Sequence, residues 1–284
     1  MTVRRSYDAA LGIALVVSLL LFVLPLAFFL RQSFYQTIAP GLVDTTPSLR
    51  NYIDLLTDRF YLDVFWRTTR LSAVAAVIGL LMAYPTAYLL ARSASRFVRM
   101  LILLLLVSSF VSIIVKVLGL TVLLGAQGPI ARLMRFVAGT APSMLHNEAA
   151  VTIGLVQYSL PLLVMLLFGV IQTIPRSLEE AASVTGASDW RIFRRVLFPL
   201  SLGGVLTSGL IAFNMNMGAF TSAVLLGGGN VLTIPVLIQR KIVTEADYPA
   251  AAALALVLTV VVFAINVAVA QIRRDRRRSR VRSA

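Results

Sequence analysis

The sequence contains no cysteine, only one histidine and few acidic residues, with 12 Asp and Glu against 26 Lys and Arg. Without cysteine the chain forms neither disulfides nor a thiolate nucleophile. The one histidine, His146, has no cluster of His, Asp or Glu residues around it, which disfavours a metal site. A serine nucleophile elbow and paired carboxylates in a pocket-forming context are also missing. The sequence therefore indicates no catalytic residue, no metal and no cofactor.

A phosphate-binding loop for ATP is also missing. Such a loop ends in Gly-Lys-Ser/Thr. The two lysines of this chain do not fit, because Lys116 follows Val115 and Lys241 follows Arg240. We therefore predict that the protein is not an enzyme, and that any ATP-driven work must draw on another polypeptide.

Apolar residues dominate the composition: 58% of the chain is hydrophobic and the mean hydropathy is +0.88. About 20 apolar residues cross the roughly 30 Å hydrocarbon layer as a helix. The alternating pattern of a barrel strand is absent, and helices satisfy their own backbone in lipid. We predict an all-α polytopic membrane protein with six transmembrane helices. The predicted spans are residues 9–30, 71–91, 100–124, 149–173, 200–226 and 249–270.

The net charge of +14 is compatible with nucleic-acid binding, but the placement of the charge favours a membrane orientation. Lys and Arg stay on the cytoplasmic side of membrane helices. Sixteen lie in the N-terminus, the second and fourth loops and the C-terminal tail, against eight in the other loops. Both termini and the fourth loop are therefore predicted to be cytoplasmic. The tail arginines are expected to contact anionic membrane lipid, with nucleic acid as the weaker interpretation.

Three regions are expected along the chain. Residues 1–67 form an N-terminal anchor helix and an external segment, residues 68–272 a five-helix core, and residues 273–284 a basic cytoplasmic tail. The external segment, Arg31–Arg67, is rich in aromatic residues and is predicted to fold as short helices at the outer surface. The alternative is that its aromatic side chains form an ordinary interfacial belt.

The fourth loop, residues 173–199, is the most informative segment, because a plain connector needs only a few polar residues. Pro175 ends the preceding helix. Ser177 and Glu180 have the spacing of a capping box at the start of a short helix. Gly186 is placed to end that helix in the left-handed conformation. The pattern predicts a short helix followed by a sharp turn.

A second short helix follows the turn, with Ser188 or Asp189 as its cap. Trp190, Phe193 and Leu197 share one face, which predicts an amphipathic helix at the inner membrane interface. Pro199 is expected to turn the chain into the fifth span. The whole loop is then a helix–turn–helix projection, which suggests that something outside the membrane grips it.

The loop resembles a known signature. Glu180-Ala181-Ala182, three residues, Gly186, nine residues and Val196-x-Phe198-Pro199 are similar to E-A-A-x3-G-x9-I-x-L-P of the membrane subunits of binding-protein-dependent ABC importers. Val196 and Phe198 are apolar replacements for Ile and Leu. Six spans with this loop between the fourth and fifth also resemble a type I importer permease, over nearly the whole chain.

Other stretches resemble the spermidine/putrescine permease branch of that family. They are Asn51-Tyr52, the run from Ala83 to Arg92 (A-Y-P-T-A-Y-L-L-A-R), and Leu225-Leu226-Gly227-Gly228. The branch implies a small, polyamine-like solute. The third span departs from the R-T-Y-A-W-like stretch of the branch at Lys116, and a lysine on the path would repel a polycation. The solute therefore stays open.

The resemblance implies a function for the loop. It would be a coupling helix that seats in a cytoplasmic ABC ATPase dimer, and the protein would be the permease subunit of an importer in the bacterial inner membrane. A second permease subunit, identical or related, and a periplasmic solute-binding protein that delivers the small-molecule solute are the other implied partners. The residues expected to couple to the ATPase are Glu179, Glu180, Ala181, Ala182, Gly186, Ala187 and Pro199.

Two alternatives remain at this point. Glu180 could serve only to cap its own helix. The chain could also be a secondary carrier or channel that is independent of an ATPase, although such carriers often have inverted repeats with broken helices, which the sequence does not indicate.

Polar groups inside the spans are candidates for the solute path, because they are costly in lipid and usually face a cavity or another helix. Asn214 and Asn216 in the fifth predicted span are the first candidates, with hydrogen bonding between helices as the alternative. Gln157 and Tyr158 in the fourth span and Tyr84 beside Pro85 in the second are further candidates.

Overall fold

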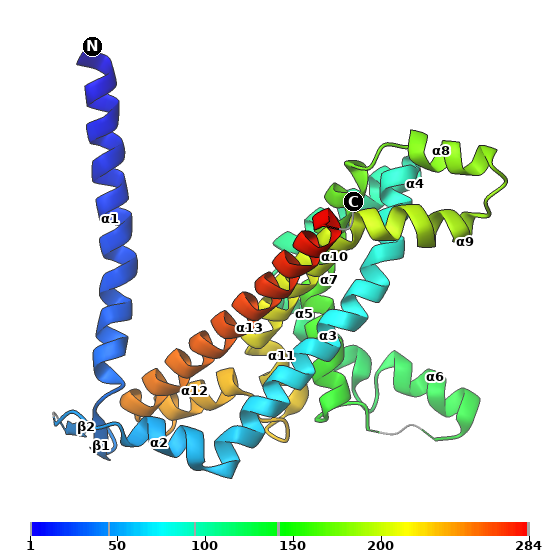
Figure 1. The fold of residues 1–284 in the computed structure, drawn as a ribbon. Coiled ribbons are helices and arrows are strands. Elements are labelled where there is room, and N and C mark those ends of the chain that lie inside the picture. Colours follow the sequence, from blue (N-terminus) through cyan, green and yellow to red (C-terminus); the bar gives the residue numbers. More distant parts are fainter. Residues whose placement is uncertain (1, 45, 94, 141–142, 283–284) are drawn as a thin grey trace. The chain divides into compact units, whose positions relative to one another are not determined.

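The computed structural model describes residues 2–44, 46–93, 95–140 and 143–282, with side chains described within residues 12 and 15–271 (Figure 1). Most of these residues are helical. The helices are α1 (Thr2–Gln32), α2 (Arg50–Thr57), α3 (Arg59–Arg92), α4 (Arg96–Phe110), α5 (Ile113–Leu124), α6 (Pro129–Ala138), α7 (Glu148–Gln172), α8 (Ser177–Val184), α9 (Asp189–Ile192), a π-helical turn η1 (Phe193–Leu197), α10 (Phe198–Met217), α11 (Thr221–Gly227), α12 (Ile234–Val243) and α13 (Tyr248–Arg282). Two strands, β1 (Gln36–Ala39) and β2 (Leu42–Asp44), form an antiparallel hairpin.

The prediction of six membrane-spanning helices is confirmed. Within the described part of the chain, six helical segments are long and apolar enough to cross a membrane. Each has between 18 and 34 residues, which is sufficient for the hydrocarbon layer. They are Leu15–Gln32, Arg59–Arg92, Ile113–Ala138, Glu148–Gln172, Asp189–Met217 and Tyr248–Gln271. The arginines predicted to contact lipid, residues 273–282, lie outside the residues whose side chains are described.

The third predicted span, residues 100–124, is not one helix. It breaks at Val111, which is extended, and at Ser112, which has the non-helical angles φ −51° and ψ 135°, into α4 and α5. Serines near the break compete for backbone hydrogen bonds and are poor interior helix formers. Lys116 of α5 donates from its Nζ atom to the carbonyl oxygen of Ser108, at 2.9 Å. The lysine therefore satisfies a carbonyl group close to the break.

The fifth predicted span, residues 200–226, is also different. Its helix starts earlier, at Asp189, and runs through η1 into α10. Gly218 follows the last residue of α10, and α11 begins again at Thr221. Glycine favours such an end, because it costs more entropy inside a helix than other residues do. Two of the predicted spans are therefore interrupted helices.

The external segment contains less helix than predicted. Residues Gln36–Asp44 form the β-hairpin, in which Gln36 pairs with Asp44 and Thr37 with Val43. Among the described residues of this segment, α2 is the only separate short helix, and its one buried residue is Leu55. Residues 59–67, expected outside the span, already belong to α3.

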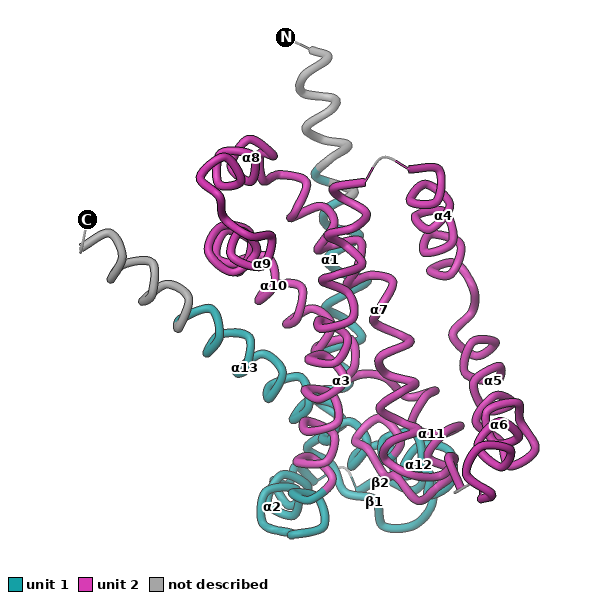
Figure 2. The backbone as a smooth tube through the Cα atoms, turned by 90° about the vertical axis from the view of Figure 1, so that its right-hand side faces the viewer, with its two compact units in different colours: residues 1–63, 237–284 teal, residues 64–236 magenta. Residues whose placement is uncertain are grey.

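The chain divides into two compact units, residues 1–63 with 237–284 and residues 64–236 (Figure 2). In the first unit, α13 packs against α1, α2 and β1. In the second unit, α7 packs against α4, α5, α10 and α11. The grouping of α13 with α1 was not expected from the sequence. The predicted functional division at residues 67 and 272 stays a prediction.

The second unit is built around α7. Its apolar core includes Leu71, Val117, Val151, Leu155 and Leu226, which come from four different helices and are almost fully buried. Within this unit, α8 and α9 lie at one end of the long helices and α6 and α11 at the other (Figure 1 and Figure 2). The fourth loop therefore stands on one end of a packed helical core.

Candidate functional site

The first helix of the fourth loop, α8, begins without the predicted capping box. Ser177 is the first residue of the helix, not its cap. The backbone N–H groups of Glu179 and Glu180 donate to the carbonyl of Arg176, at 2.9 and 3.0 Å, and that of Leu178 donates to Pro175. Because the helix begins one residue earlier than expected, backbone carbonyls replace the serine hydroxyl. The prediction of a capping box was therefore wrong. The Glu180 side chain is exposed.

The turn after α8 follows the prediction. Gly186 has φ +76°, in the left-handed region. Its N–H group donates to the carbonyl of Ser183 at 2.9 Å, and that of Ala187 donates to Ala182 at 3.3 Å. These two bonds form a Schellman motif, in which glycine is favoured because it has no Cβ atom. Apart from the adjacent residues, no atom of the described chain lies within 4 Å of the position that a Cβ atom would take at Gly186, so this side of the turn is open.

The second half of the loop is one helical path into the membrane. Ser188 is the cap residue of α9, and its carbonyl accepts from the N–H groups of Arg191 and Ile192 at 2.8 and 2.9 Å. The predicted apolar face is present but only partly buried: Leu197 is buried, Phe193 is half-buried and Trp190 is 69% exposed. Trp190 stacks on Phe193 instead, with ring centroids 5.3 Å apart.

Pro199 does not produce the expected turn. It lies in the first turn of α10, where proline is tolerated, and the helix is continuous from Asp189 to Met217. The π-helical turn η1 replaces the predicted break. Such turns distort a helix locally without interrupting it.

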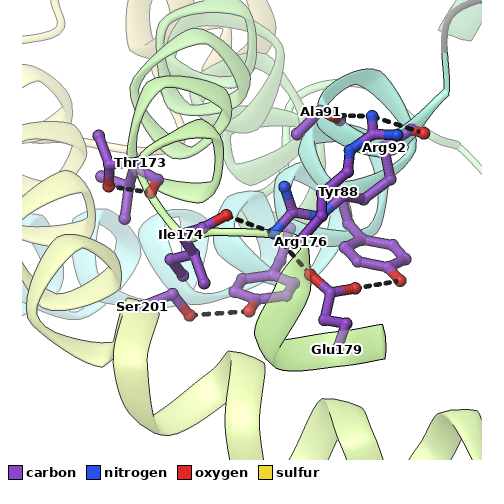
Figure 3. Close-up of polar contacts among 10 residues, drawn as sticks. Tyr88, Ala91, Arg92, Thr173, Ile174, Arg176, Glu179 and Ser201 are labelled. Carbon is purple, nitrogen blue, oxygen red and sulfur yellow. Dashed lines mark hydrogen bonds and ion pairs between the residues drawn. The ribbon is translucent and has the colours of Figure 1, made fainter. Parts of the chain in front are cut away.

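Polar contacts fasten the loop to the end of α3 (Figure 3). Arg92 pairs with Glu179, with Arg92 Nη2 2.5 Å from Glu179 Oε1, and the Tyr88 hydroxyl donates to Glu179 Oε2 at 3.3 Å. Arg92 also donates to the carbonyl of Ile174 at 3.0 Å. In return, Arg176 donates to the carbonyls of Ala91 and Arg92, at 3.1 and 2.9 Å. The end of α3 and the start of α8 therefore hold one another.

Aromatic contacts make a second attachment. The ring of Tyr84 in α3 meets Phe193 of η1 edge-on at 5.5 Å and Phe198 at 6.2 Å. Its hydroxyl lies 2.8 Å from that of Ser201 in α10. Tyr84, predicted to line a solute path, thus lies buried at the contact between α3 and the second half of the loop.

The remaining coupling candidates in and beside α8 are exposed or half-buried. None of the residues of α8 is buried: Ala181 is exposed and Ala182 half-buried, as are Ala187 after the turn and Glu179 at its ion pair. Small side chains beside an open turn leave the backbone approachable. A partner can therefore come close to this surface without displacing any packed side chain.

The other path candidates are placed in or near the core of the second unit. Asn216 is 2% exposed, and neither atom of its side-chain amide has a partner among the described residues. Asn214 is half-buried and engaged in an interaction. Gln157 is half-buried, and Tyr158 packs against the apolar core. Two buried hydroxyls, of Ser222 and Thr233, likewise have no partner within the described chain.

Several residues of the site were not assigned to it from the sequence: Arg92, Tyr88, Arg176 and Ser201. Arg92 and Tyr88 belong to the A-Y-P-T-A-Y-L-L-A-R stretch. Their proximity to the fourth loop depends on the tertiary fold and leaves no local pattern.

Known proteins are similar to this chain in sequence. The family model described as "Binding-protein-dependent transport system inner membrane component" matches residues 73–278. The spermidine/putrescine transport system permease protein PotB of Escherichia coli is 30% identical, over 83% of this chain and 86% of PotB. PotB of Haemophilus influenzae is 29% identical over 85% and 86%. The molybdenum transport system permease protein ModB of Mycobacterium tuberculosis is 32% identical over 66% and 71%.

Solved structures share the fold. A bacterial ABC transporter involved in the import of alginate gives a TM-score of 0.80 at 17% identity, covering 96% of both chains. The MetNI methionine ABC transporter gives 0.59 at 18% identity, covering 75% of this chain and 94% of the other. The family model covers most of the chain, and the six spans and the fourth-loop signature agree with it. The protein therefore belongs to the binding-protein-dependent transport system inner membrane components, as a multi-pass permease subunit of an ABC importer.

Proposed function

We propose that the fourth loop, residues 173–199, is the coupling site at which a cytoplasmic ABC ATPase dimer drives this permease. The observation that supports the proposal is the Schellman turn at Gly186. It presents an unburied helix with small side chains, Ala181 and Ala182, at one end of the packed core. The other positions of this surface are Glu180, Ala187 and Pro199, whereas Glu179 is held by Arg92 and Tyr88 and faces α3. The proposal also places the loop and both termini in the cytoplasm, because Lys and Arg are concentrated in these segments.

The work of the importer is then divided between subunits. The chain lacks a phosphate-binding loop, so ATP is hydrolysed on the partner. An ATPase dimer with twofold symmetry offers two grooves and this chain supplies one loop, which calls for a second permease, identical or related. Closure of the dimer around ATP draws the two loops together. That movement shifts the permease between two packings and opens the path toward the binding protein.

The solute class we propose is a polyamine-like cation delivered by a periplasmic binding protein. It rests on the PotB relatives, which match most of the chain. A lysine on the solute path would repel a polycation. The Lys116 ammonium group, however, donates a hydrogen bond to the Ser108 carbonyl near the end of α4. The negative end of a helix dipole offsets part of that charge. A thermal shift of the partner binding protein tests this point: spermidine or putrescine should raise its melting temperature, and a shift with molybdate alone would reject the class.

The coupling site is tested with two variants and a matched control. Gly186→Val strains the turn, and Glu180→Lys reverses an exposed charge. Both should insert into the membrane normally and lose co-purification with the co-expressed ATPase. Gly139→Val is the control, because Gly139 also has positive φ, +73°, and an open side, but ends α6. Wild-type co-purification by both loop variants would reject the proposal.

A carrier that is independent of ATP is the second candidate. The broken helices that the sequence did not indicate are present, at Val111–Ser112 and at Gly218, and such breaks are common in carriers. Family membership outweighs this feature. Uptake in vesicles decides between the two: an importer requires ATP, whereas uptake with an ion gradient and no ATP would establish the carrier.

A further inference from the structure

The hold on α8 is polar. Since no residue of α8 is buried, packing of apolar side chains contributes little to its position. An ion pair and hydrogen bonds instead join the loop to the end of α3, with donors on both sides. Arg92 of α3 binds Glu179 and the carbonyl of Ile174, and Arg176 of the loop binds two carbonyls at the end of α3. We call Arg92, Glu179, Tyr88 and Arg176 the clasp (Figure 3).

The ion pair of the clasp is more shielded from water than an ordinary surface pair. The side chains of Arg92 and Glu179 are 13% and 16% exposed. By comparison, those of Arg240 and Glu245 are 59% and 36% exposed. Removing one partner of a shielded pair leaves a charge without its counter-ion away from water, whereas an exposed pair contributes little. The clasp therefore resists separation of α8 from α3.

Both halves of the loop reach the same helix. The first half holds α3 through Arg92, and the second half holds it about two turns earlier through Tyr84, which contacts Phe193. Further along, α3 meets α7 at one close approach: a Cβ atom added at Gly79 would lie 2.8 Å from Leu163 Cδ1. A displacement of the loop therefore acts on α3 at two points, Arg92 and Tyr84. The same helix continues into the apolar core of the second unit.

We propose that the Arg92–Glu179 pair transmits movement of the coupling loop to α3, and that Arg92 and Glu179 are positioning residues for ATP-driven import. The proposal rests on the proposed function of the loop. Without the pair, α8 still seats in the ATPase, since its outward surface is unchanged, but its movement is no longer applied to the end of α3. ATP hydrolysis then continues without a matching amount of transport.

The test measures transport per ATP in proteoliposomes that contain the assembled importer and its binding protein. Arg92→Ala and Glu179→Gln should co-purify with the ATPase as wild type does, while uptake per ATP hydrolysed falls at least tenfold. The double variant Arg92→Glu with Glu179→Arg should recover most of that ratio. Arg240→Ala is the control, because it breaks an exposed pair elsewhere, and it should leave the ratio unchanged. A wild-type ratio in both single variants overturns the proposal.

A second measurement does not depend on transport. The chain has no cysteine, so Leu89→Cys on α3 and Ser177→Cys on α8, two exposed positions outside the proposed docking surface, carry a unique pair of spin labels. With the clasp intact, the distance between the labels should be the same with and without ATP. With Arg92→Ala it should change on ATP binding. An ATP-dependent change of equal size in both backgrounds overturns the proposal.

The two proposals fail in different ways. If the loop does not couple to the ATPase, Gly186→Val retains co-purification. If only the clasp proposal is wrong, Gly186→Val loses co-purification while Arg92→Ala transports normally.

Discussion

The hydroxyl groups of Tyr84 and Ser201 lie 2.8 Å apart and join α3 to α10 at a buried contact. The ring of Tyr84 makes further contacts with Phe193 and Phe198. In this arrangement Tyr84 contributes to helix packing near the fourth loop, and its place on the solute path stays a prediction.

Tyr84→Phe should therefore lower stability without stopping transport. It removes one buried hydrogen bond and keeps the ring contacts, so we expect a loss of about 1 kcal/mol. Ser201→Ala should cost a similar amount, and the double variant should cost less than the sum, because both changes remove the same bond. Unfolding in detergent measures these values. Abolished uptake in Tyr84→Phe at unchanged stability would return Tyr84 to the path.

Gly204 lies where α10 and α7 approach closely. A Cβ atom there would lie 2.4 Å from Val170 Cγ1 and 2.9 Å from Val170 Cβ. Val170 is β-branched and cannot easily turn away. Gly204→Ala should then destabilise the protein by about 1–3 kcal/mol through overpacking, and Val170→Ala should restore most of the loss.

Gly169 is the control for this prediction. It also lies in a helix, α7, but apart from its own helix backbone no atom of the described chain lies within 4 Å of its Cβ position. Gly169→Ala should be neutral or slightly stabilising, because alanine is the better helix former. Equal effects of the two alanines in thermal unfolding would show that contact with Val170 is not the cause.

The predictable parts of this molecule depend on neighbours in sequence. Gly186 could be placed in its left-handed turn because the Schellman motif needs only the residues of one turn. The six spans follow from apolar length alone. The capping box at Ser177 failed because one residue of shift at the helix start, set by Pro175 and Arg176, gave the N–H groups backbone partners.

The unpredictable parts depend on contacts between distant segments or on breaks inside apolar runs. Arg92 and Glu179 come from different helices, so no spacing in the sequence relates them. The breaks at Ser112 and Gly218 lie inside apolar runs that hydropathy alone reads as continuous. The β-hairpin was missed because its strands are only four and three residues long.

Asp247 fastens that hairpin within the first compact unit. Its Oδ1 atom accepts from Thr37 Oγ1 at 2.6 Å and from the N–H group of Ala250, in the first turn of α13, at 3.2 Å. Asp247→Ala should cost about 1 kcal/mol as a lost helix cap and release the hairpin. Limited digestion with proteinase K should cleave residues 36–44 faster in this variant. Asp54→Ala, an exposed aspartate in α2, should digest at the wild-type rate.

Asn216 offers the sharpest test of the solute path. It is 2% exposed, and its amide N and O atoms have no hydrogen-bond partner among the described residues. A buried amide without hydrogen-bond partners lowers the stability of the fold. In this packing Asn216 therefore does not join two helices by hydrogen bonds. Replacing it with an apolar side chain of similar size removes that cost.

Asn216→Leu should therefore keep the melting temperature at or above the wild-type value, while ATP-driven uptake falls at least fivefold. The amide can bind solute only when the second packing of the helices exposes it, and leucine cannot replace its hydrogen bonds. Met217→Leu, at the adjacent buried residue, controls for packing and should leave uptake unchanged. If Asn216→Leu instead lowers stability and retains uptake, the asparagine joins helices and the path lies elsewhere.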